Sequence, residues 1–469
     1  MRCAVVPVAR PTFDTAKAEQ LTKQAFALLT EIGFETQGSQ KLVMTPEDLS
    51  IAQSEIVNDA DLYILMQSSF CDASSAVALM SSRKAPVLLW SFREPGKVGE
   101  RLLLNSMCGS NLAAHALVHN GETIYHLHGN PNEEATKSAL EDLLDGNLPK
   151  EVEPPLKLNQ ELADVKQVSE ILESVKGTKI GAIGDAPAGF TPCVYDSEQL
   201  MRLFGITIEP LTVEDIFQRI QDLDESVVDA EYAAALSAQP SLANVNVDEA
   251  RKVSATTQVL DQWRINSNLT AVAVRCWPEF PTQLGACPCG ALSRMADRGT
   301  ATACERDVLG AVTMVLMEAL GAGTTYLVDV VDQVPSENLI RLWHCGAAAT
   351  SLAANPSEAT QFTHCNRKLG VAGNFPLKTG PVIMARLDQD VDPSNPTGLR
   401  LIISSGESIP AENQFQGNTA TVRMQIPPAA FVNGLITRGF PHHLVLAWSD
   451  IRPQLRQMAK LQSIPLIEW

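Results

Sequence analysis

Three polar side chains in the middle of the chain are of the types that could bind a divalent cation. Glu305 lies in "ATACERDVLGAV" at a predicted helix start, Asp329 lies in the apolar strand "TYLVDVV", and His344 follows "NLIRLW". A carboxylate in a first helical turn is usually explained by the helix dipole. A carboxylate in a buried strand, however, is costly unless it is paired or bound to metal. Together they predict an oxygen-rich Mn²⁺ or Mg²⁺ site with one imidazole.

Two adjacent histidines stand near the C-terminus, in "GFPHHLVLAWSD", although the whole chain has only eight. Neighbouring side chains of an extended strand point to opposite faces. We therefore expect only one of His442 and His443 to face a given site. The pair is the predicted source of a further ligand from the C-terminal part of the chain.

Strand and helix patterns predict the scaffold for these residues. Apolar strand-like runs alternate with amphipathic segments, which indicates parallel α/β layers. After about residue 350, short alternating runs such as "PVIMARLD" indicate an antiparallel β unit, barrel-like, followed by a closing helix. We predict an N-terminal α/β domain at 1–165, a central one with the metal carboxylates at 166–350, and a C-terminal β domain with the histidine ligand at 351–469. The first boundary rests on a polar segment broken by Pro154 and Pro155.

Charge and composition exclude several classes of function. The net charge is −18 and no basic run is present, which argues against nucleic acid or an anionic membrane as the main partner. No apolar run is long enough for a membrane helix, and the N-terminus does not resemble a signal peptide. Apart from Cys287 and Cys289 in "CPCG", the ten cysteines are scattered singly. This usage suits a reducing cytoplasm, and the close pair is expected in a buried turn.

Several segments, taken in order, resemble the L-fucose isomerase and L-arabinose isomerase superfamily, most of all its shorter fucose-isomerase-like branch. They are "VPVARPTFD", "LLWSFREPG", "CERDVLGAVTMVLMEAL", "YLVDVVDQVPSENLIRLWHCG" and "GFPHHLVLAWSD". The resemblance implies a Mn²⁺-dependent aldose–ketose isomerase, with Mg²⁺ or Co²⁺ as other candidate ions. It also implies two α/β domains, a C-terminal β domain, and a homohexamer or tetramer.

The resemblance carries over to individual residues where the motifs match. It implies that Glu305, Asp329 and His443 bind the metal, and that Glu305 and Asp329 also serve as the acid/base pair. His442 then borders the substrate or is structural. His344 resembles an extra histidine of the arabinose type and is expected to bind metal or substrate.

Two further matches imply a site shared between subunits. Trp90 in "LLWSF" matches a tryptophan that neighbouring subunits lend to the sugar site, and Arg10 in "ARPTFD" matches an arginine with a similar role. Both are predicted substrate contacts. The active site would then be complete only in the oligomer.

The expected activity is the interconversion of an aldose and a ketose through a cis-enediol, on a free deoxy-hexose, pentose or 6-substituted hexose. One alternative is an acidic sugar such as sulfoquinovose, whose anionic tail would be held by arginines; the candidates are Arg10, Arg275, Arg386 and Arg423. A second alternative is a non-catalytic sugar-binding or regulatory protein of the same fold. A lyase or epimerase using the same intermediate is a third, and its products would distinguish it.

Overall fold

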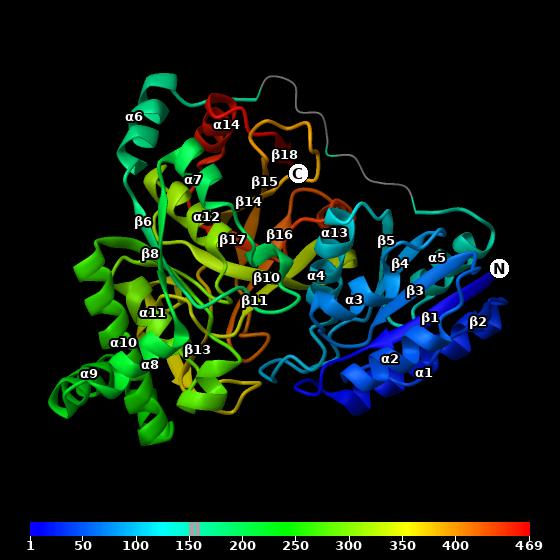
Figure 1. Cartoon of the computed structure of the whole chain (residues 1–469), viewed down its shortest axis with the longest axis horizontal. Coiled ribbons are helices and arrows are strands. Elements are labelled where there is room, and N and C mark those ends of the chain that lie inside the picture. Colours follow the sequence, from blue (N-terminus) through cyan, green and yellow to red (C-terminus); the bar gives the residue numbers. More distant parts are fainter. Residues whose placement is uncertain (150–153, 155–159) are drawn as a thin grey trace.

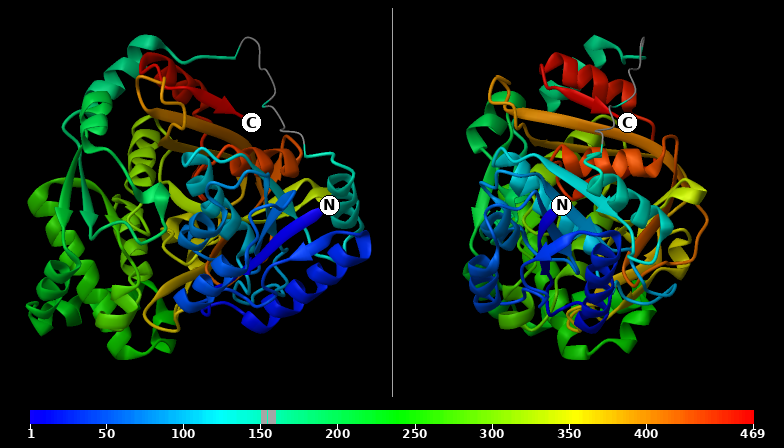
Figure 2. Two further views of the ribbon diagram at one scale, coloured as in Figure 1. Left: turned by 45° about the vertical axis from the view of Figure 1, so that its right-hand side comes forward. Right: turned by 90° about the vertical axis from the view of Figure 1, so that its right-hand side faces the viewer.

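The computed structural model describes residues 1–149, 154 and 160–469. The predicted break at Pro155 lies outside the described residues. The described residues form three sheets, and strands of the third lie between the N-terminal unit and the central helices (Figures 1 and 2). The expected α/β class, with two parallel sheets and a barrel-like third unit, is confirmed.

The first sheet is parallel, with strand order β2-β1-β3-β4-β5. Its three inner strands are buried on both faces, so they appear in the sequence as continuous apolar runs such as "LYILMQ". The strands are β1 (Arg2–Val8), β2 (Glu35–Gln37), β3 (Leu62–Gln67), β4 (Val87–Ser91) and β5 (Ile124–His128). The helices are α1 (Thr15–Ile32), α2 (Pro46–Glu55), α3 (Ala73–Met80), α4 (Ser106–His119) and α5 (Glu134–Leu144).

The second sheet is also parallel, with order β7-β6-β8-β9. Its strands are β6 (Lys179–Ile183), β7 (Thr207–Leu211), β8 (Leu269–Val274) and β9 (Ala301–Ala303). Its helices are α6 (Val165–Val175), α7 (Ser197–Phe204), α8 (Val213–Gln221), α9 (Glu225–Ala238), α10 (Val247–Ser267), α11 (Cys289–Asp297) and α12 (Val308–Ala319). Parallel sheets gather functional groups at the carboxyl ends of their strands, and the chain leaves β9 there on its way to α12.

The third sheet has nine strands in the order β12-β13-β16-β11-β10-β17-β14-β15-β18. Its strands are β10 (Tyr326–Val334), β11 (Leu339–His344), β12 (Thr360–Phe362), β13 (Ala372–Pro376), β14 (Gly380–Gln389), β15 (Leu399–Ile409), β16 (Asn418–Met424), β17 (His443–Ala447) and β18 (Leu466–Glu468). Helices α13 (Pro428–Thr437) and α14 (Arg452–Leu461) accompany it. Because β16 pairs with both β11 and β15, the antiparallel strands β16-β11-β10-β17-β14-β15 close into a ring, a barrel-like arrangement.

The third sheet begins earlier in the sequence than expected. Strands β10 and β11 pair antiparallel with each other and with β17 and β16, so they belong to this sheet and not to the central parallel one. The predicted boundary at residue 350 therefore cuts through a unit that starts at β10. The reason is that an apolar strand does not reveal its pairing partners by its own composition.

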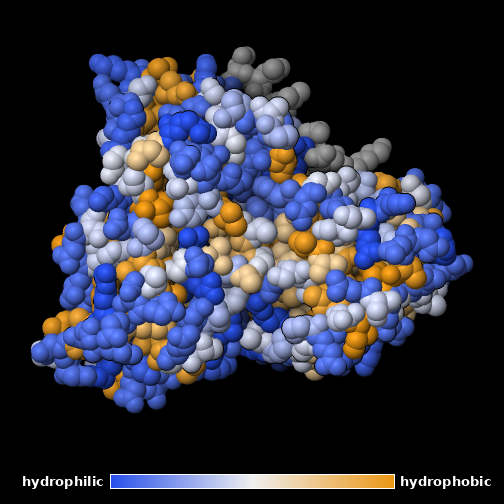
Figure 3. Space-filling view, viewed as in Figure 1, coloured by the Kyte–Doolittle hydropathy of each residue, from blue (hydrophilic) through white to orange (hydrophobic). Residues whose placement is uncertain are grey.

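Helix α12 holds the second and third sheets together. Residues 308–317 are all buried, and the helix packs against β8 and β9 on one side and β14 and β17 on the other. This packing fixes the β9–α12 turn against the start of β17. The face drawn in Figure 3 is largely hydrophilic with scattered apolar residues, and among the described residues no helix is long and apolar enough to cross a membrane.

Candidate functional site

Glu305 lies in the turn between β9 and α12, not in the first turn of the helix as predicted. The helix begins at Val308, and Asp307 is its N-cap, accepting a hydrogen bond from the Gly310 N–H. Glu305 and Arg306 have φ values of 59° and 60°, in the left-handed region. A non-glycine residue there stores strain of order 1–3 kcal/mol, and such residues cluster at functional sites. The turn therefore holds the Glu305 carboxylate in a position that ordinary helix geometry would not give.

The register of the third sheet brings the second carboxylate and the histidine together. Asp329 on β10 lies directly opposite His443 on β17, and cross-strand partners on one face lie within about 5 Å of each other. The Nε2 atom of His443 is 3.6 Å from Asp329 Oδ1 and 3.5 Å from Glu305 Oε2. Three predicted ligands, far apart in the sequence, thus meet at one point.

The state of these atoms fits a divalent cation. His443 Nδ1 lies 2.8 Å from Asp307 Oδ2, so this nitrogen carries the ring proton and Nε2 presents a lone pair. Both His443 Nε2 and Asp329 Oδ1 are buried without a hydrogen-bond partner among the described residues. Ligand–cation bonds of about 2.1 Å put neighbouring octahedral ligands about 3 Å apart, slightly closer than the observed spacing. A cation would satisfy both orphaned atoms.

Electrostatics favour the protonation states that metal binding needs. Burial alone would raise the pKa of Glu305, but the hydrogen bond with His442 opposes burial, and the pKa is lowered to about 2. Burial, with the neighbouring His442, lowers the pKa of His443. The carboxylate is therefore ionised and the imidazole neutral near neutral pH, as a metal ligand set requires.

A buried ion pair between Asp307 and Arg386 orients His443 through its Nδ1–H, and the sequence analysis did not predict this pair. The Asp307 carboxylate accepts hydrogen bonds from Arg386 Nη1 at 2.6 Å and Nη2 at 2.8 Å. Both side chains are 0% exposed, and although burial opposes ionisation, Arg386 and His443 hold the pKa of Asp307 well below its usual range. The signals were an aspartate at a helix N-cap position and an arginine inside an apolar strand. The expectation that Arg386 holds an anionic substrate is wrong, because both of its Nη groups donate to Asp307 and its side chain is completely buried.

The expectation that His442 and His443 face opposite ways is wrong. Strand β17 begins at His443, and His442 lies in the bend before it, so strand alternation does not apply to the pair. Their ring centroids are 4.0 Å apart. His442 Nε2 lies 3.2 Å from Glu305 Oε2, so both histidines contact the same carboxylate.

His344 ends strand β11 beside these groups, with its ring centroid 5.3 Å from that of His443. Its Nδ1 accepts the backbone N–H of Cys345 at 2.9 Å. The ring proton of a neutral His344 therefore resides on Nε2, which makes this nitrogen a hydrogen-bond donor. The arrangement fits the predicted substrate contact better than a metal ligand.

A cleft opens onto this group. Its walls come from all three sheets and their loops. The lining residues are Arg10, Thr12, Phe13, Phe70, Asn105, Cys108, Cys276, Trp277, Cys287, Cys289, Glu305, Asp329, Trp343, His344, Cys345, His364, Asn366, Arg367 and His442. Glu305, Asp329, His344, His442 and Arg10, all predicted site residues, therefore share one cavity.

Comparison with known proteins identifies the family. A protein named sulfoquinovose isomerase from Alkalicoccus urumqiensis is 31% identical over 466 residues, covering 99% of this chain and 98% of that protein. The chain belongs to the sulfoquinovose isomerase family. Relatives of the same name from Priestia megaterium and Clostridium sp. (strain MSTE9) are 29% identical over 468 residues and 27% over 461 residues, covering 98% of this chain and 97% of each relative. No family profile matches the chain.

Membership of the sulfoquinovose isomerase family makes this chain an enzyme, a sugar aldose–ketose isomerase. Two positive side chains lie in its cleft. The guanidinium carbons of Arg10 and Arg367 lie 4.8 and 5.6 Å from the ring centroid of Trp277. Arg10 belongs to the same chain as the other lining residues, so no neighbouring subunit is needed to supply it. Arg367 stands in a loop with no distinctive local pattern, and the sequence reasoning missed it.

The other residues predicted to contact substrate lie elsewhere. Trp90 is 0% exposed in the core of the first sheet, and its indole N–H donates to the Gly129 carbonyl at 2.9 Å. This burial argues against a direct sugar contact. Arg275 forms a two-pronged ion pair with Glu279, and Arg423 is exposed beside Glu407. Neither arginine lines the cleft.

Proposed function

We propose that this enzyme interconverts sulfoquinovose and its 2-ketose in a reaction that depends on a divalent cation, with Mn²⁺ as the first candidate. The observation that carries the proposal is one cleft with two kinds of group. Glu305, Asp329 and His443 converge at a point suited to a cation, and Arg10 and Arg367 stand beside Trp277 in the same cleft. The names of the relatives agree with the proposed substrate and reaction.

Glu305, Asp329 and His443 would hold the ion. The chemistry supplied by a bound Mn²⁺ is Lewis-acid stabilisation of negative charge on the sugar oxygens O1 and O2. Asp307 and Arg386 keep His443 oriented with its Nε2 lone pair toward the site. Removal of such supporting partners typically weakens metal affinity 10- to 100-fold.

The proton transfer is assigned to the carboxylates. In an aldose–ketose isomerisation one proton moves between C2 and C1, and another moves between the two oxygens. A carboxylate of Glu305 or Asp329 takes the carbon-bound proton and returns it to the neighbouring carbon, through a cis-enediol. His442, 3.2 Å from Glu305 Oε2, can exchange a proton with that carboxylate. The Nε2–H of His344 would donate a hydrogen bond to a sugar oxygen.

Trp277 links the two ends of the proposed substrate site. Its indole N–H lies 3.4 Å from Glu305 Oε1, and Arg10 and Arg367 both lie over the ring of the same side chain. The positive charges of the two arginines are therefore separated from the Glu305 carboxylate by about the width of one indole ring. Sulfoquinovose has the matching layout, because its reacting carbons are C1 and C2 and its sulfonate is on C6, at the far end of the molecule.

The two arginines differ in whether the guanidinium already forms an ion pair within the protein. Arg10 Nη2 forms an ion pair with Asp72 Oδ2 at 3.0 Å, which positions the guanidinium while leaving some of its N–H groups available. Arg367 forms no ion pair within the described part of the chain, and it is partly exposed. Guanidinium groups bind tetrahedral anions through paired hydrogen bonds. We therefore assign sulfonate binding mainly to Arg367, with Arg10 as its partner.

The first experiment tests the reaction. Purified protein is stripped with EDTA, restored with Mn²⁺, and followed by proton NMR in D₂O with sulfoquinovose, L-fucose, L-arabinose and D-arabinose. We expect metal-dependent formation of the ketose from sulfoquinovose, with deuterium at the transferred carbon. Faster turnover of a neutral sugar would refute the substrate assignment but leave the isomerase activity intact.

The second experiment tests the sulfonate assignment with Arg367→Met and Arg10→Met. Charge-assisted hydrogen bonds contribute about 1.5–3 kcal/mol, so kcat/KM for sulfoquinovose should fall about 10- to 100-fold. The value for the analogue lacking the sulfonate, 6-deoxyglucose, should change little. Arg423→Met is the matched control, because that arginine is exposed outside the cleft. Equal losses for both sugars would contradict sulfonate binding.

Assembly is a separate part of the proposal. A homohexamer or tetramer is the form that the fucose-isomerase resemblance implies, and the cytoplasm is the compartment that the cysteine usage favours. Light scattering coupled to size-exclusion chromatography would measure the subunit number. A stable, active monomer would rule out an essential contribution from a neighbouring subunit.

A further inference from the structure

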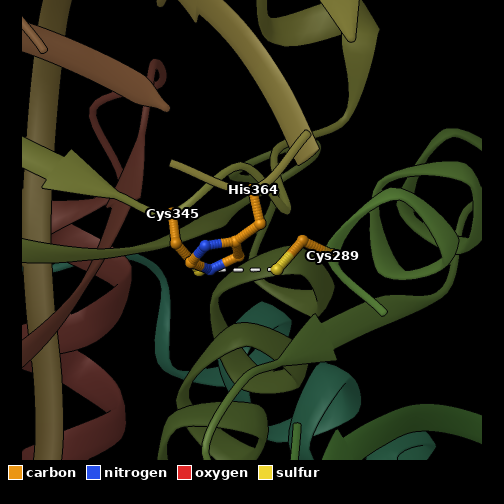
Figure 4. Close-up of side chains that lie close together, drawn as sticks. All are labelled: Cys289, Cys345 and His364. Atoms are coloured by element: carbon orange, nitrogen blue, oxygen red, sulfur yellow. Dashed lines mark hydrogen bonds between the residues drawn. The ribbon is translucent and has the colours of Figure 1, made fainter. Parts of the chain in front are cut away.

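A cluster of thiols forms one wall of the substrate cleft. Cys289 at the start of α11, Cys345 just after β11, and His364 in the loop after β12 point toward one another (Figure 4). The two sulfur atoms are 3.5 Å apart. All three residues line the cleft, although neither thiol has a place in the isomerase chemistry described above.

The orientation of His364 decides between a metal site and a thiol–imidazole group. Its Nδ1 accepts the backbone N–H groups of Asn366 and Arg367, each at 3.2 Å. The ring proton of neutral His364 must then be on Nε2, the nitrogen on the other side of the ring. A metal ion would need a lone pair on that nitrogen, whereas a thiolate would accept its N–H. The geometry therefore favours a stabilised thiolate over a Cys₂His metal centre.

Access and reactivity single out Cys345. It is the one partly exposed thiol among the chain's ten cysteines; the other nine are buried. Hydrogen bonds from Cys289 and Cys304, together with the neighbouring His344, hold the pKa of the Cys345 thiol well below its usual range. Low-pKa, accessible thiols beside a second thiol are the pattern of oxidation-sensitive cysteines.

We propose that Cys345 and Cys289 are joined into a reversible disulfide when the enzyme meets hydrogen peroxide, and that this bond shuts down the sugar cleft. The inference does not depend on which sugar is the substrate. It requires the sulfur atoms to move from 3.5 Å to the length of a disulfide bond, about 2.05 Å. That shift draws the end of β11 toward α11.

The chemistry balances in two steps. The Cys345 thiolate attacks one oxygen of the peroxide, the O–O bond breaks, and hydroxide leaves, which gives a sulfenic acid. The Cys289 thiol then attacks that sulfur, the S–O bond breaks, and water leaves as the S–S bond forms. The two thiols lose two electrons and the peroxide gains both. A dithiol reductant returns both cysteines to thiols by thiol–disulfide exchange and is itself oxidised to a disulfide.

The loss of activity follows from what Cys345 supports. Its backbone N–H is the donor that orients His344, and its sulfur lies 3.3 Å from the same ring. Drawing Cys345 toward Cys289 would break this contact and narrow the cleft beside Asp329 and His442. Substrate binding and turnover should both suffer.

The test treats the Mn²⁺-loaded enzyme with hydrogen peroxide, quenches it with catalase, and measures both isomerase activity and peptides. We expect a non-reduced peptide joining Cys289 to Cys345, together with at least a tenfold loss of activity that dithiothreitol restores. The cross-linked peptide is read by mass spectrometry, so it is scored even if the proposed substrate is wrong. Absence of this peptide while other cysteines are oxidised would overturn the proposal.

Three variants sharpen the test. Cys345→Ser should remain active after peroxide, and Cys289→Ser should be inactivated irreversibly, because without its partner Cys345 oxidises further to the sulfinic acid. Cys287→Ser is the matched control: Cys287 is buried and lies two residues before Cys289, just ahead of α11, and this variant should still form the Cys289–Cys345 bond. Inactivation of Cys345→Ser at the wild-type rate would refute the role of this thiol.

Discussion

Replacing the buried ion pair behind His443 should weaken metal binding while the chain stays folded. Asp307 Oδ2 accepts the His443 Nδ1–H, with 2.8 Å between the nitrogen and the oxygen, and the same carboxylate accepts hydrogen bonds from Arg386. Losing such an orienting carboxylate weakens metal affinity about 10- to 100-fold, which corresponds to about 1.4–2.8 kcal/mol. We expect this loss in the double variant Asp307→Asn with Arg386→Met.

The double variant is chosen because Asp307→Asn alone would change both the metal affinity and the stability of the fold. Asp307→Asn alone strands Arg386, which is 0% exposed, and an unpaired buried charge costs about 3–5 kcal/mol of stability. Removing both charges avoids most of that penalty. The amide oxygen of an asparagine can still accept the His443 N–H, although without the negative charge that raises the basicity of the ring.

Calorimetric titration of the metal-free protein with Mn²⁺ measures the affinity, and thermal unfolding by circular dichroism measures stability. The control is Asp388→Asn with Arg400→Met. Asp388 is likewise 0% exposed, paired with Arg400 at 2.8 Å and His115 at 3.3 Å, but it lies outside the predicted ligand group. Its loss should change stability and leave Mn²⁺ affinity within about twofold. If the Asp307 variant binds Mn²⁺ as tightly as this control, the supporting role assigned to Asp307 is wrong.

Three other perturbations have defined outcomes. His442→Gln should lower kcat about 10²- to 10⁴-fold, as loss of acid/base assistance does, with Mn²⁺ affinity within about threefold in calorimetry; a larger effect on affinity would make His442 a ligand. Gly310→Ala should weaken Mn²⁺ binding, because its Cβ would stand 2.6 Å from Asp307 Oδ2 and 2.7 Å from Arg386 Nη1; unchanged binding would mean that the pair shifts freely. Burial lowers the pKa of His126 from 6.5 to about 3, so between these pH values the unfolded chain binds a proton that the folded chain does not. The free energy of unfolding should therefore be highest above pH 6.5 and fall by up to about 5 kcal/mol as the pH falls toward 3. Urea unfolding at pH 7 and pH 5 should show a smaller difference for His126→Gln than for the wild type.

Much of the scaffold follows from local sequence patterns. Helix α1 ends at Gly33, in the left-handed conformation that its position after the apolar pattern predicts. The continuous apolar runs of the first sheet are buried parallel strands, as expected for strands covered on both faces. The pairing of β10 and β11 could not be predicted in this way. Strands in either kind of sheet can be equally apolar, and their partners β16 and β17 lie far along the chain.

The predicted ligands illustrate the same division. Asp329 stands out in the sequence because a carboxylate in an apolar strand needs a partner. No residue near Asp329 in the sequence indicates what that partner is. The structure shows that it is His443, directly across the β10–β17 ladder. For His442, the alternation rule failed because the start of β17 is set by pairing with β10. Arg367 has no local signal at all, since a loop arginine is ordinarily a solvated surface charge.

The sequence by itself determined the chemical inventory of this enzyme: two carboxylates and a pair of histidines suited to a hard divalent cation, placed at the ends of predicted elements. Tertiary structure alone decided that Glu305, Asp329 and His443 meet, that Asp307 and Arg386 orient the histidine, and that Arg10 and Arg367 share the ring of Trp277. The physical reason is that residue type fixes which contacts are possible. Strand register and the packing of α12 between two sheets select which of those contacts form.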